Sequence, residues 1–204
     1  MKIYFRPFAC SLAARIAILE AELDAEFVQV PDDRRLPDGR HFTELSPMGT
    51  VPALETRGGL VLTEGPAVLS YIAGLAPEGA LSFTGFSDAH YRMLGWLNFT
   101  STELHKAVFA PLFNRATGPE ERAAALASAA KPLGVLERHL AGRVFLEDRF
   151  TVADAYLLAV LNWCEHAGVP IADWPEVLAY RTRLRQRPSV ARAMAEEMPL
   201  LKAA

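Results

Sequence analysis

Cysteine and runs of basic residues are both scarce in this chain of 204 residues. Its two cysteines, Cys10 and Cys164, lie far apart, which fits neither a disulfide framework nor a zinc-ligand spacing. Lysine and arginine form no stripe that would neutralise a row of phosphates, and the net charge is only −3. These absences argue against a disulfide-stapled protein, a metal site and a nucleic-acid partner, and Cys10 is expected to carry a thiol.

A long apolar run is also lacking. The longest nearly apolar run, residues 155–164, is interrupted by Asn162 and is about half of the ~20 residues that a bilayer requires. Residues 1–7 contain neither an apolar core nor a small-residue cleavage site, so no export signal is expected. Because 51% of the residues are hydrophobic, we expect a folded protein. Since neither an export signal nor a membrane span is expected, we predict a cytoplasmic protein with no membrane partner. The nearly balanced charge favours a small molecule or another protein as the ligand.

Short strand and helix patterns alternate through residues 1–77, which we predict to form the first domain. Alternating apolar residues predict strands at residues 2–5, 26–30, 51–56 and 60–62. Helical spacing predicts helices at 11–21 and 65–75 and a helical turn at 42–45. A charged loop at 31–39 connects the second strand to this turn. The opening strand, helix and strand predict a parallel βαβ unit. The tight Arg-Gly-Gly turn makes the last two strands antiparallel.

Residues 86–204 contain only helical patterns and are predicted to form a second, all-helical domain behind a linker at 78–85. The helices are predicted at residues 88–113, 119–140, 152–167, 174–186 and 189–197. Pro132 predicts a kink or restart in the second of these, because proline has no N–H to donate. Thr151 and Asp154 predict a capping box at the start of the apolar third helix, which we place at the centre of the domain.

Cys10 lies where a strand pattern gives way to a helix pattern. The motif Pro-x-Ala-Cys-Ser at residues 7–11 predicts a turn, so Cys10 and Ser11 fall at the helix start. The first turn of a helix has N–H groups without partners and a partial positive charge, both of which favour a thiolate. The alternative is that Cys10 fills the corner between strand and helix while Ser11 is an ordinary N-cap.

Two further segments of the first domain suit the binding of a peptide. A cis bond at Val51-Pro52 would turn the Val51 N–H and C=O outward, whereas a trans proline would only bound the strand. Glu64 and Gly65 precede Pro66 at a helix start, where N–H groups suit a carboxylate and Glu64 suits an ammonium group. The alternative is a plain helix start with an acidic residue that the helix dipole favours.

Polar residues recur on one face of the first helix of the second domain. Asn98, Thr102 and His105 are spaced i, i+4 and i+7, so they share that face. A polar stripe on a buried helix needs hydrogen-bond partners, which would make it part of a site. A solvated face with a structural histidine explains the same spacing.

Taken together, these motifs resemble the glutathione transferase family, and within it the bacterial beta class. They cover nearly the whole chain in the family's order: Pro-x-Ala-Cys-Ser-Leu-Ala at 7–13, Ser-Pro-x-Gly-x-Val-Pro-Ala-Leu at 46–54, Leu-Thr-Glu-Gly at 62–65, Trp-Leu-Asn-Phe at 96–99, Glu-x-His-Lys at 103–106 and Phe-Thr-Val-Ala-Asp-Ala-Tyr at 150–156. Each motif is weak alone, but their order and spacing make the combination specific.

The resemblance implies a thioredoxin-like α/β N-terminal domain, an all-α C-terminal domain, and a cytosolic homodimer that binds glutathione between the domains. Cis Pro52 would expose the Val51 backbone to the cysteinyl unit of glutathione. Glu64 and Gly65 would hold the γ-glutamyl end, and Arg34 would replace a family lysine near the glycyl carboxylate. From the helical domain the implied binding residues are Asn98, Thr102, Glu103, Leu104, His105 and Lys106. The implied catalytic residues beside the sulfur are Cys10, Ser11 and His105, without a metal.

The chain departs from the family pattern at three positions. Phe5 stands where the beta class usually has tyrosine, so no phenol there can activate the thiol, and Tyr4 should face the other side of the strand. Phe8 replaces a common glycine, which would reshape the pocket for the second substrate. Ser46 replaces an asparagine, and no consequence is expected.

The implied reaction is conjugation of the glutathione thiolate to a small hydrophobic electrophile, as in detoxification, with an apolar pocket between Phe8, Phe109 and Phe113. An alternative is an oxidoreductase or peroxidase that forms a mixed disulfide between Cys10 and glutathione. Because Cys-Ser-Leu-Ala lacks a second cysteine, only a monothiol route is open to it. A third possibility is a non-catalytic protein that binds hydrophobic ligands.

Overall fold

The computed structural model describes residues 1–85 and 87–202, which form two compact units. The first unit is Met1–Thr84 together with the chain from Arg187 onward, and the second is Gly85–Gln186. The break therefore falls at the end of the predicted linker, 78–85, but the last helix groups with the first unit and not with the predicted domain 86–204. Residue 86 and residues 203–204, which that domain was expected to include, lie outside the described residues.

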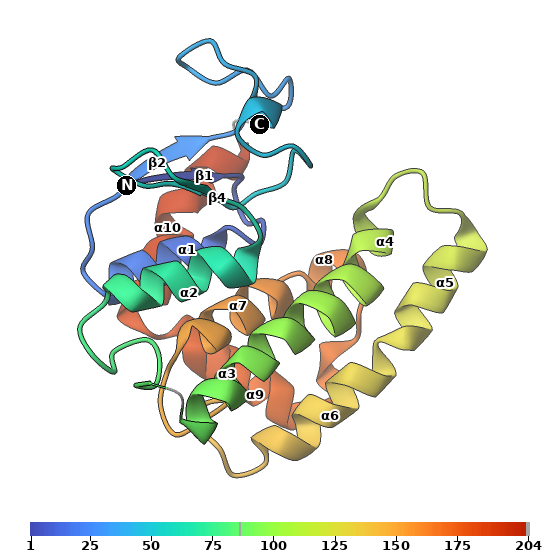
Figure 1. The fold of residues 1–204 in the computed structure, drawn as a ribbon. Helices are drawn as coiled ribbons and strands as arrows, with labels where there is room; N and C mark the ends of the chain where they lie inside the picture. The colour runs from blue at the N-terminus through green and yellow to red at the C-terminus, as the bar shows by residue number, and fades with distance from the viewer. Residues whose placement is uncertain (86, 203–204) are drawn as a thin grey trace. The chain divides into compact units, whose positions relative to one another are not determined.

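The first unit is built on a mixed sheet of β1 (Lys2–Phe5), β2 (Glu26–Gln29), β3 (Ala53–Glu55) and β4 (Val61–Leu62), in the order β2-β1-β3-β4. β1 pairs in parallel with β2 and antiparallel with β3, and β3 pairs antiparallel with β4. The predicted βαβ unit and the antiparallel pair are both confirmed. α1 (Leu12–Glu20) and α2 (Gly65–Leu75) lie side by side along the sheet in Figure 1.

The two faces of β1 have different neighbours. Tyr4 packs in a cluster with Phe42 and Ala53, and its hydroxyl donates to Glu55 Oε2 at 2.8 Å. Burial and Glu55 raise the pKa of Tyr4 to about 12. Phe5 instead packs edge-on against Phe27, as the predicted opposite orientation of residues 4 and 5 requires. The Tyr4 phenol is thus committed to a carboxylate on its own side of the sheet.

The long C-terminal helix α10 (Pro188–Lys202) extends beyond the predicted residues 189–197 and packs against α1. Arg15 of α1 is 5% exposed and donates to Glu197 at 2.9 Å and to Glu196 at 3.0 Å. Its guanidinium also lies 3.8 Å from the centroid of the Phe27 ring. A buried cation paired and stacked in this way explains why the chain returns to the first unit.

The second unit is entirely helical within the described residues. In chain order its elements are α3 (Asp88–Phe99), η2 (Thr100–Phe109), α4 (Ala110–Phe113), α5 (Pro119–Ser128), α6 (Ala130–Leu140), α7 (Val152–Leu161), α8 (Cys164–Ala167), η3 (Ile171–Asp173) and α9 (Pro175–Arg185). No described helix is both long and apolar enough to cross a membrane.

Two predicted helices of this unit differ from the structure. The predicted helix 88–113 is continuous, but its middle, η2, has the wider π-helical turn. The predicted helix 152–167 is interrupted after Leu161, where Trp163 N–H bonds Val160 O only three residues back and tightens the turn. The restart expected from Pro132 is confirmed at Ala129, between α5 and α6, because Pro132 has no N–H for the Ser128 carbonyl.

All residues of α7 are buried, and α3, η2 and α9 pack around it, so it is the centre of the helical unit as predicted. The capping box at its start is also confirmed: Thr151 N–H donates to Asp154 at 2.8 Å. Asp154 has two further partners in the Leu146 N–H at 2.9 Å and the Tyr180 hydroxyl at 2.8 Å. Asp154 therefore joins the preceding loop and α9 to the central helix.

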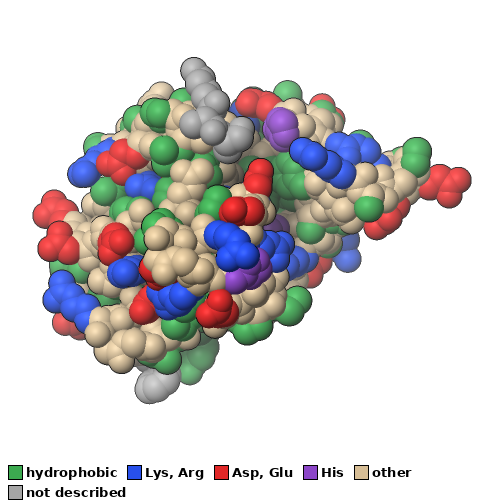
Figure 2. Space-filling model, turned by 90° about the horizontal axis from the view of Figure 1, so that it is seen from above, with side chains coloured by type: hydrophobic (Ala, Val, Ile, Leu, Met, Phe, Trp, Pro, Cys, Tyr) green, Lys and Arg blue, Asp and Glu red, His purple; other side chains and the backbone are tan. Residues whose placement is uncertain are grey.

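On the face drawn in Figure 2, basic and acidic side chains are interleaved and form no broad patch of one sign. This pattern is that of a mixed, solvated surface.

Replacing Asp154 with alanine should lower the free energy of unfolding by about 3 kcal/mol, because the buried donors of Leu146, Thr151 and Tyr180 lose their acceptor. Urea unfolding followed by circular dichroism measures the change. Asp148→Ala, at an exposed position in the same loop, is the control and should cost less than about 0.5 kcal/mol. Equal stability of the two variants would contradict this role of Asp154.

Candidate functional site

The turn between β1 and α1 holds Cys10 next to the loop that carries Val51. The Cys10 Sγ donates a hydrogen bond to the Val51 carbonyl at 3.0 Å, and Cys10 is 9% exposed. α1 begins at Leu12, so Cys10 lies just before the helix, in the turn that the sequence predicts. Two of the predicted site residues, 41 positions apart in the chain, are thereby brought into contact.

Ser11 is fully buried, and its hydroxyl serves the turn. Its Oγ accepts from the Arg6 N–H and donates to the Arg6 carbonyl, both at 3.2 Å. Because the side chain makes no cap hydrogen bond to α1, the alternative that Ser11 is an ordinary N-cap is wrong. Ser11 shapes the turn from which Cys10 projects.

Phe8 has a φ of +54°, a conformation that glycine adopts without cost and that side chains disfavour. This φ explains why glycine suits the position, at which Phe8 departs from the family pattern. The turn is held in place by Glu197 of α10, which accepts from the Phe8 N–H at 2.7 Å and from Arg15. Burial raises the pKa of Glu197, and the Phe8 and Arg15 donors oppose that shift.

The loop before β3 contains the cis peptide bond Val51-Pro52 that the family resemblance implied. Ser46 closes this loop, since its Oγ donates to the Thr50 carbonyl at 2.9 Å and accepts from the Thr50 N–H at 3.3 Å. Serine at this position therefore supplies both a donor and an acceptor to the loop. The loop is therefore held by two contacts: Ser46 bonds Thr50 inside the loop, and Cys10 bonds the Val51 carbonyl from the turn after β1.

Arg34 lies over the same loop. A Cβ at Gly49 would overlap the Arg34 guanidinium, so only glycine allows Arg34 to lie so close. Gly49 has a φ of +63° and Arg34 a φ of +59°. The exposed guanidinium is thus brought beside the segment that ends in Val51 and Pro52, where the resemblance implied a carboxylate-binding cation.

Glu64 is the residue before α2, and it is exposed with a φ of +67°. Its carbonyl accepts the Val68 N–H at 3.0 Å, which starts the helix, while Pro66 has no N–H to leave unpaired. The Gly65 and Ala67 N–H groups lie in the first turn and have no helical acceptor. The predicted helix start is confirmed, and its role as a ligand site stays a prediction.

In the second unit the predicted polar stripe divides into two parts. Asn98 and Thr102 are exposed, and the Thr102 hydroxyl donates to the Asn98 carbonyl at 3.1 Å and lies 3.1 Å from Glu103 Oε1. Glu103 and Lys106 are exposed as well, whereas Leu104 is fully buried, so its side chain belongs to the core. The stripe is therefore partly a solvated face.

His105 is the member of the stripe that turns inward. Its Nδ1 lies 2.9 Å from the Tyr156 hydroxyl, and its ring packs edge-on against Trp163 with centroids 4.9 Å apart. Burial, assisted by the charge of Lys106, lowers the pKa of His105 to about 4. The imidazole is consequently neutral at pH 7, and it can serve as a hydrogen-bond donor or acceptor but not as a cation.

Sequence reasoning missed the residues that support these groups. Glu197 and Arg15 were not foreseen because a contact between α1 and the last helix leaves no mark in local patterns. Tyr156 is the last residue of the motif at 150–156, and Trp163 follows it. Both are more than 50 residues from His105 in the chain, so local sequence patterns could not predict their contacts with it. No group of three or more His, Cys, Asp or Glu among the described residues could hold a metal ion, and the expected absence of a metal stays a prediction.

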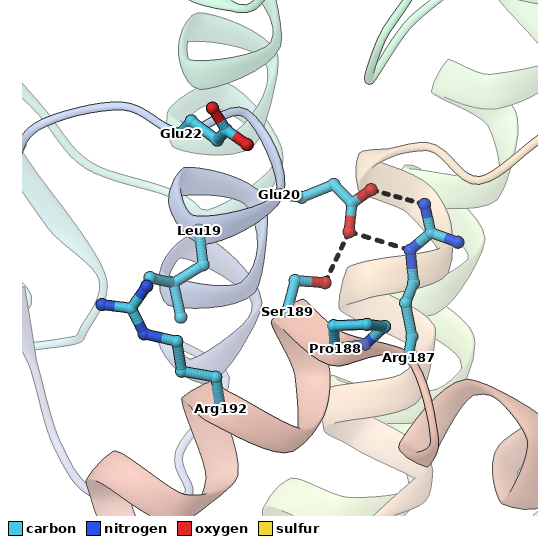
Figure 3. A pocket seen from close by; sticks show the side chains of 7 residues that line it. All are labelled: Leu19, Glu20, Glu22, Arg187, Pro188, Ser189 and Arg192. Atoms are coloured by element: carbon cyan, nitrogen blue, oxygen red, sulfur yellow. Dashed lines mark hydrogen bonds and ion pairs between the residues drawn. The ribbon is translucent and has the colours of Figure 1, made fainter.

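A hollow of about 410 Å³ lies between α1 and α10, away from the predicted site residues. Figure 3 shows the Glu20 carboxylate directed toward Arg187 and Ser189 across this hollow. The Arg187 Nε donates to Glu20 Oε2 at 2.8 Å and the Ser189 hydroxyl donates to the same oxygen, so these three side chains satisfy one another. The contact joins the two helices.

Comparisons with known proteins identify the chain's family. Residues 9–75 match the family model "Glutathione S-transferase, N-terminal domain", and residues 101–188 match "Glutathione S-transferase, C-terminal domain". The chain is 35% identical to glutathione S-transferase GstA of Escherichia coli O157:H7, over 97% of this chain and 98% of that one. It therefore belongs to the glutathione S-transferase family.

Solved structures agree with this assignment. A sphingomonad glutathione S-transferase complexed with glutathione is 41% identical, with a TM-score of 0.92 over 97% of this chain and 98% of that one. The bacterial beta class enzyme of Sphingomonas chungbukensis is 38% identical, with a TM-score of 0.92 over 97% and 99%. The fold that the family resemblance implied, a thioredoxin-like domain followed by an all-helical domain, is confirmed.

A titration of His105 followed by NMR should have its midpoint near pH 4, because the buried ring resists protonation. The folded pKa lies below the ordinary value near 6.5, so the folded protein binds the proton less tightly than the unfolded chain. His105 thus contributes stability above about pH 6.5 that is lost progressively as the pH falls toward 4. His105→Asn identifies the resonance by its loss, and a midpoint near 6.5 would contradict the burial argument.

Proposed function

We propose that the protein is a glutathione transferase that conjugates the glutathione thiolate to small hydrophobic electrophiles. The observation that supports this best is the hydrogen bond from Cys10 to Val51 beside cis Pro52, in a chain of this family. An extended tripeptide that pairs with the Val51 backbone would bring its own cysteinyl sulfur next to Cys10. Solved relatives complexed with glutathione support the choice of ligand.

The remaining groups of the first unit suit the two ends of glutathione. Arg34 offers a planar guanidinium to the glycyl carboxylate, which it can bind through two parallel hydrogen bonds. At the other end, the Gly65 and Ala67 N–H groups suit the γ-glutamyl carboxylate, and Glu64 suits the ammonium group. Each charged group of the ligand would then meet a group of opposite charge or a free N–H.

Activation of the ligand requires that its thiol lose a proton, since the thiolate is the nucleophile. Each pKa unit by which the site favours the anion corresponds to about 1.4 kcal/mol. Cys10 and, from the helical unit, His105 are the proposed hydrogen-bond partners of that sulfur, while Phe5 has no hydroxyl to take part. Ser11 acts only by shaping the turn, because Arg6 occupies its hydroxyl.

For the electrophile we propose an apolar surface on the helical unit. Phe113 is 41% exposed and packs edge-on against Trp163, while Phe109 is fully buried behind it. Phe113 therefore offers the aromatic contact, and Phe109 supports it. A cytoplasmic homodimer with a role in detoxification remains part of the proposal.

A mixed-disulfide route through Cys10 is the second candidate, because the same contact would place the two sulfurs together. The Cys10 thiolate would attack the glutathione sulfur of a glutathionylated substrate. A disulfide between Cys10 and glutathione then forms, and the substrate leaves as a thiolate that takes up a proton. A second glutathione thiolate would then displace Cys10 and leave as glutathione disulfide.

Cys10→Ala should abolish reduction of a glutathionylated substrate and slow conjugation to a chlorodinitrobenzene-type electrophile about tenfold, since one hydrogen bond to the thiolate is lost. Cys164→Ala is the matched control, because burial raises the pKa of the Cys164 thiol to about 12 and keeps it inert. Unchanged conjugation in Cys10→Ala would contradict the role of this thiol. Absence of saturable glutathione binding to the unaltered protein in calorimetry would contradict the proposed function itself.

Arg34→Ala should raise the KM for glutathione about tenfold with kcat changed less than about twofold, because a charge-assisted contact to the ground-state ligand is lost. Steady-state kinetics with glutathione as the varied substrate measure both constants. Arg35→Ala removes an equal charge from the neighbouring exposed residue and should leave KM unchanged. Equal effects of the two substitutions would indicate general electrostatics and contradict a specific site at Arg34.

A further inference from the structure

His105 is held from two directions by elements with different roles. It is carried by η2, whose π-helical turn is wider than an α-helical one, and it faces Tyr156 of the central helix α7. The Tyr156 side chain is 2% exposed, and α7 is fixed at its start by Thr151 and Asp154. The hydroxyl at His105 therefore comes from the buried central helix of the unit.

The contact involves one particular nitrogen of the ring. Tyr156 lies 2.9 Å from Nδ1, and the edge-on packing against Trp163 at 4.9 Å restricts rotation of the ring. Among the described residues, the structure gives no hydrogen-bond partner to Nε2. The nitrogen that remains for a ligand is therefore Nε2.

The direction of this hydrogen bond follows from acidity. A phenol is a stronger acid than a neutral imidazole and therefore the better donor, and an imidazole nitrogen without hydrogen is a better acceptor than a phenol oxygen. In a neutral ring, the nitrogen that accepts leaves the proton on the other nitrogen. Donation from Tyr156 to Nδ1 consequently places the hydrogen of His105 on Nε2.

We propose that Tyr156 is a positioning residue that fixes His105 as the neutral tautomer with its proton on Nε2, so that His105 donates a hydrogen bond and does not act as a base. This inference rests on the proposed function, in which His105 approaches the glutathione sulfur. An Nε2–H can stabilise a thiolate but cannot accept the proton of a thiol. No proton is transferred to His105, and the thiol proton leaves to solvent.

The low basicity of the ring agrees with this assignment. Tyr156 and Trp163 contact the His105 ring, and neither carries a negative charge that would stabilise an imidazolium. On its own helix, the charge of Lys106 disfavours the imidazolium, and the exposed Glu103 carboxylate accepts from the Thr102 hydroxyl. A second proton would have to enter at Nδ1 and break the bond that Tyr156 donates. His105 therefore keeps a single proton through the range in which a glutathione thiolate is formed.

The decisive experiment is nitrogen-15 NMR of the imidazole in the unliganded protein at pH 7. The unaltered protein should show a protonated Nε2 and an unprotonated Nδ1 at His105. Tyr156→Phe should convert this pattern into a mixture of both tautomers, whereas Tyr71→Phe, a tyrosine of the first unit, should leave it unchanged. A proton on Nδ1 of the unaltered protein, or an unchanged pattern in Tyr156→Phe, would overturn the proposal, and the first of these outcomes needs no variant to fold.

Kinetics then separate this proposal from the proposed function. Tyr156→Phe should lower kcat for conjugation about tenfold with little change in the KM for glutathione. The reason is that part of the His105 population would lack the Nε2 hydrogen, and with it the hydrogen bond that stabilises the transition state. His105→Gln should show a similar loss. If the tautomer changes as expected but His105→Gln keeps full activity, the role of Tyr156 stands and the proposed role of His105 in conjugation fails.

Discussion

The hydrogen bond from Cys10 to the Val51 carbonyl is the constraint around which the first unit is arranged. It joins the turn after β1 to the loop before β3, and each partner is separately fixed. Ser11 and Glu197 hold the turn through Arg6 and Phe8, while Ser46 holds the loop through Thr50. Because hydrogen bonds hold both sides, the separation between the sulfur and the backbone of Val51 is defined, which is what a pre-formed ligand site needs.

The C-terminal helix is part of this arrangement. Glu197 is fully buried and binds both the Phe8 N–H and the Arg15 side chain, so the end of the chain stabilises the turn near its beginning. Removal of one partner from a buried ion pair typically costs about 3–5 kcal/mol, because the other charge is left without compensation. The Glu20–Arg187 pair makes a second connection between α1 and the start of α10. The integrity of the Cys10 turn therefore depends on residues almost 190 positions away.

Local patterns predicted most of the elements, and contacts between distant segments account for what they missed. The bounds of β1 and α2, the capping box at Thr151 and the restart near Pro132 follow from spacing and from proline chemistry, so they could be predicted. Local patterns also raised a cis bond at Pro52 and Cys10, Glu64 and His105 as candidate site residues, but each had a structural alternative. The family motifs favoured the functional interpretation of each. The π-helical geometry of η2, the break after Leu161 and the return of α10 to the first unit depend on packing, which no local pattern records.

The most direct test of the account is a crystal structure of the protein with glutathione. We expect the cysteinyl backbone of the ligand to pair with Val51, its sulfur to lie beside the Cys10 Sγ, and its glycyl carboxylate to contact Arg34. A covalent bond between the two sulfurs would favour the mixed-disulfide route at the same site. Glutathione bound away from Cys10 and Val51, for example in the hollow between α1 and α10, would contradict the account.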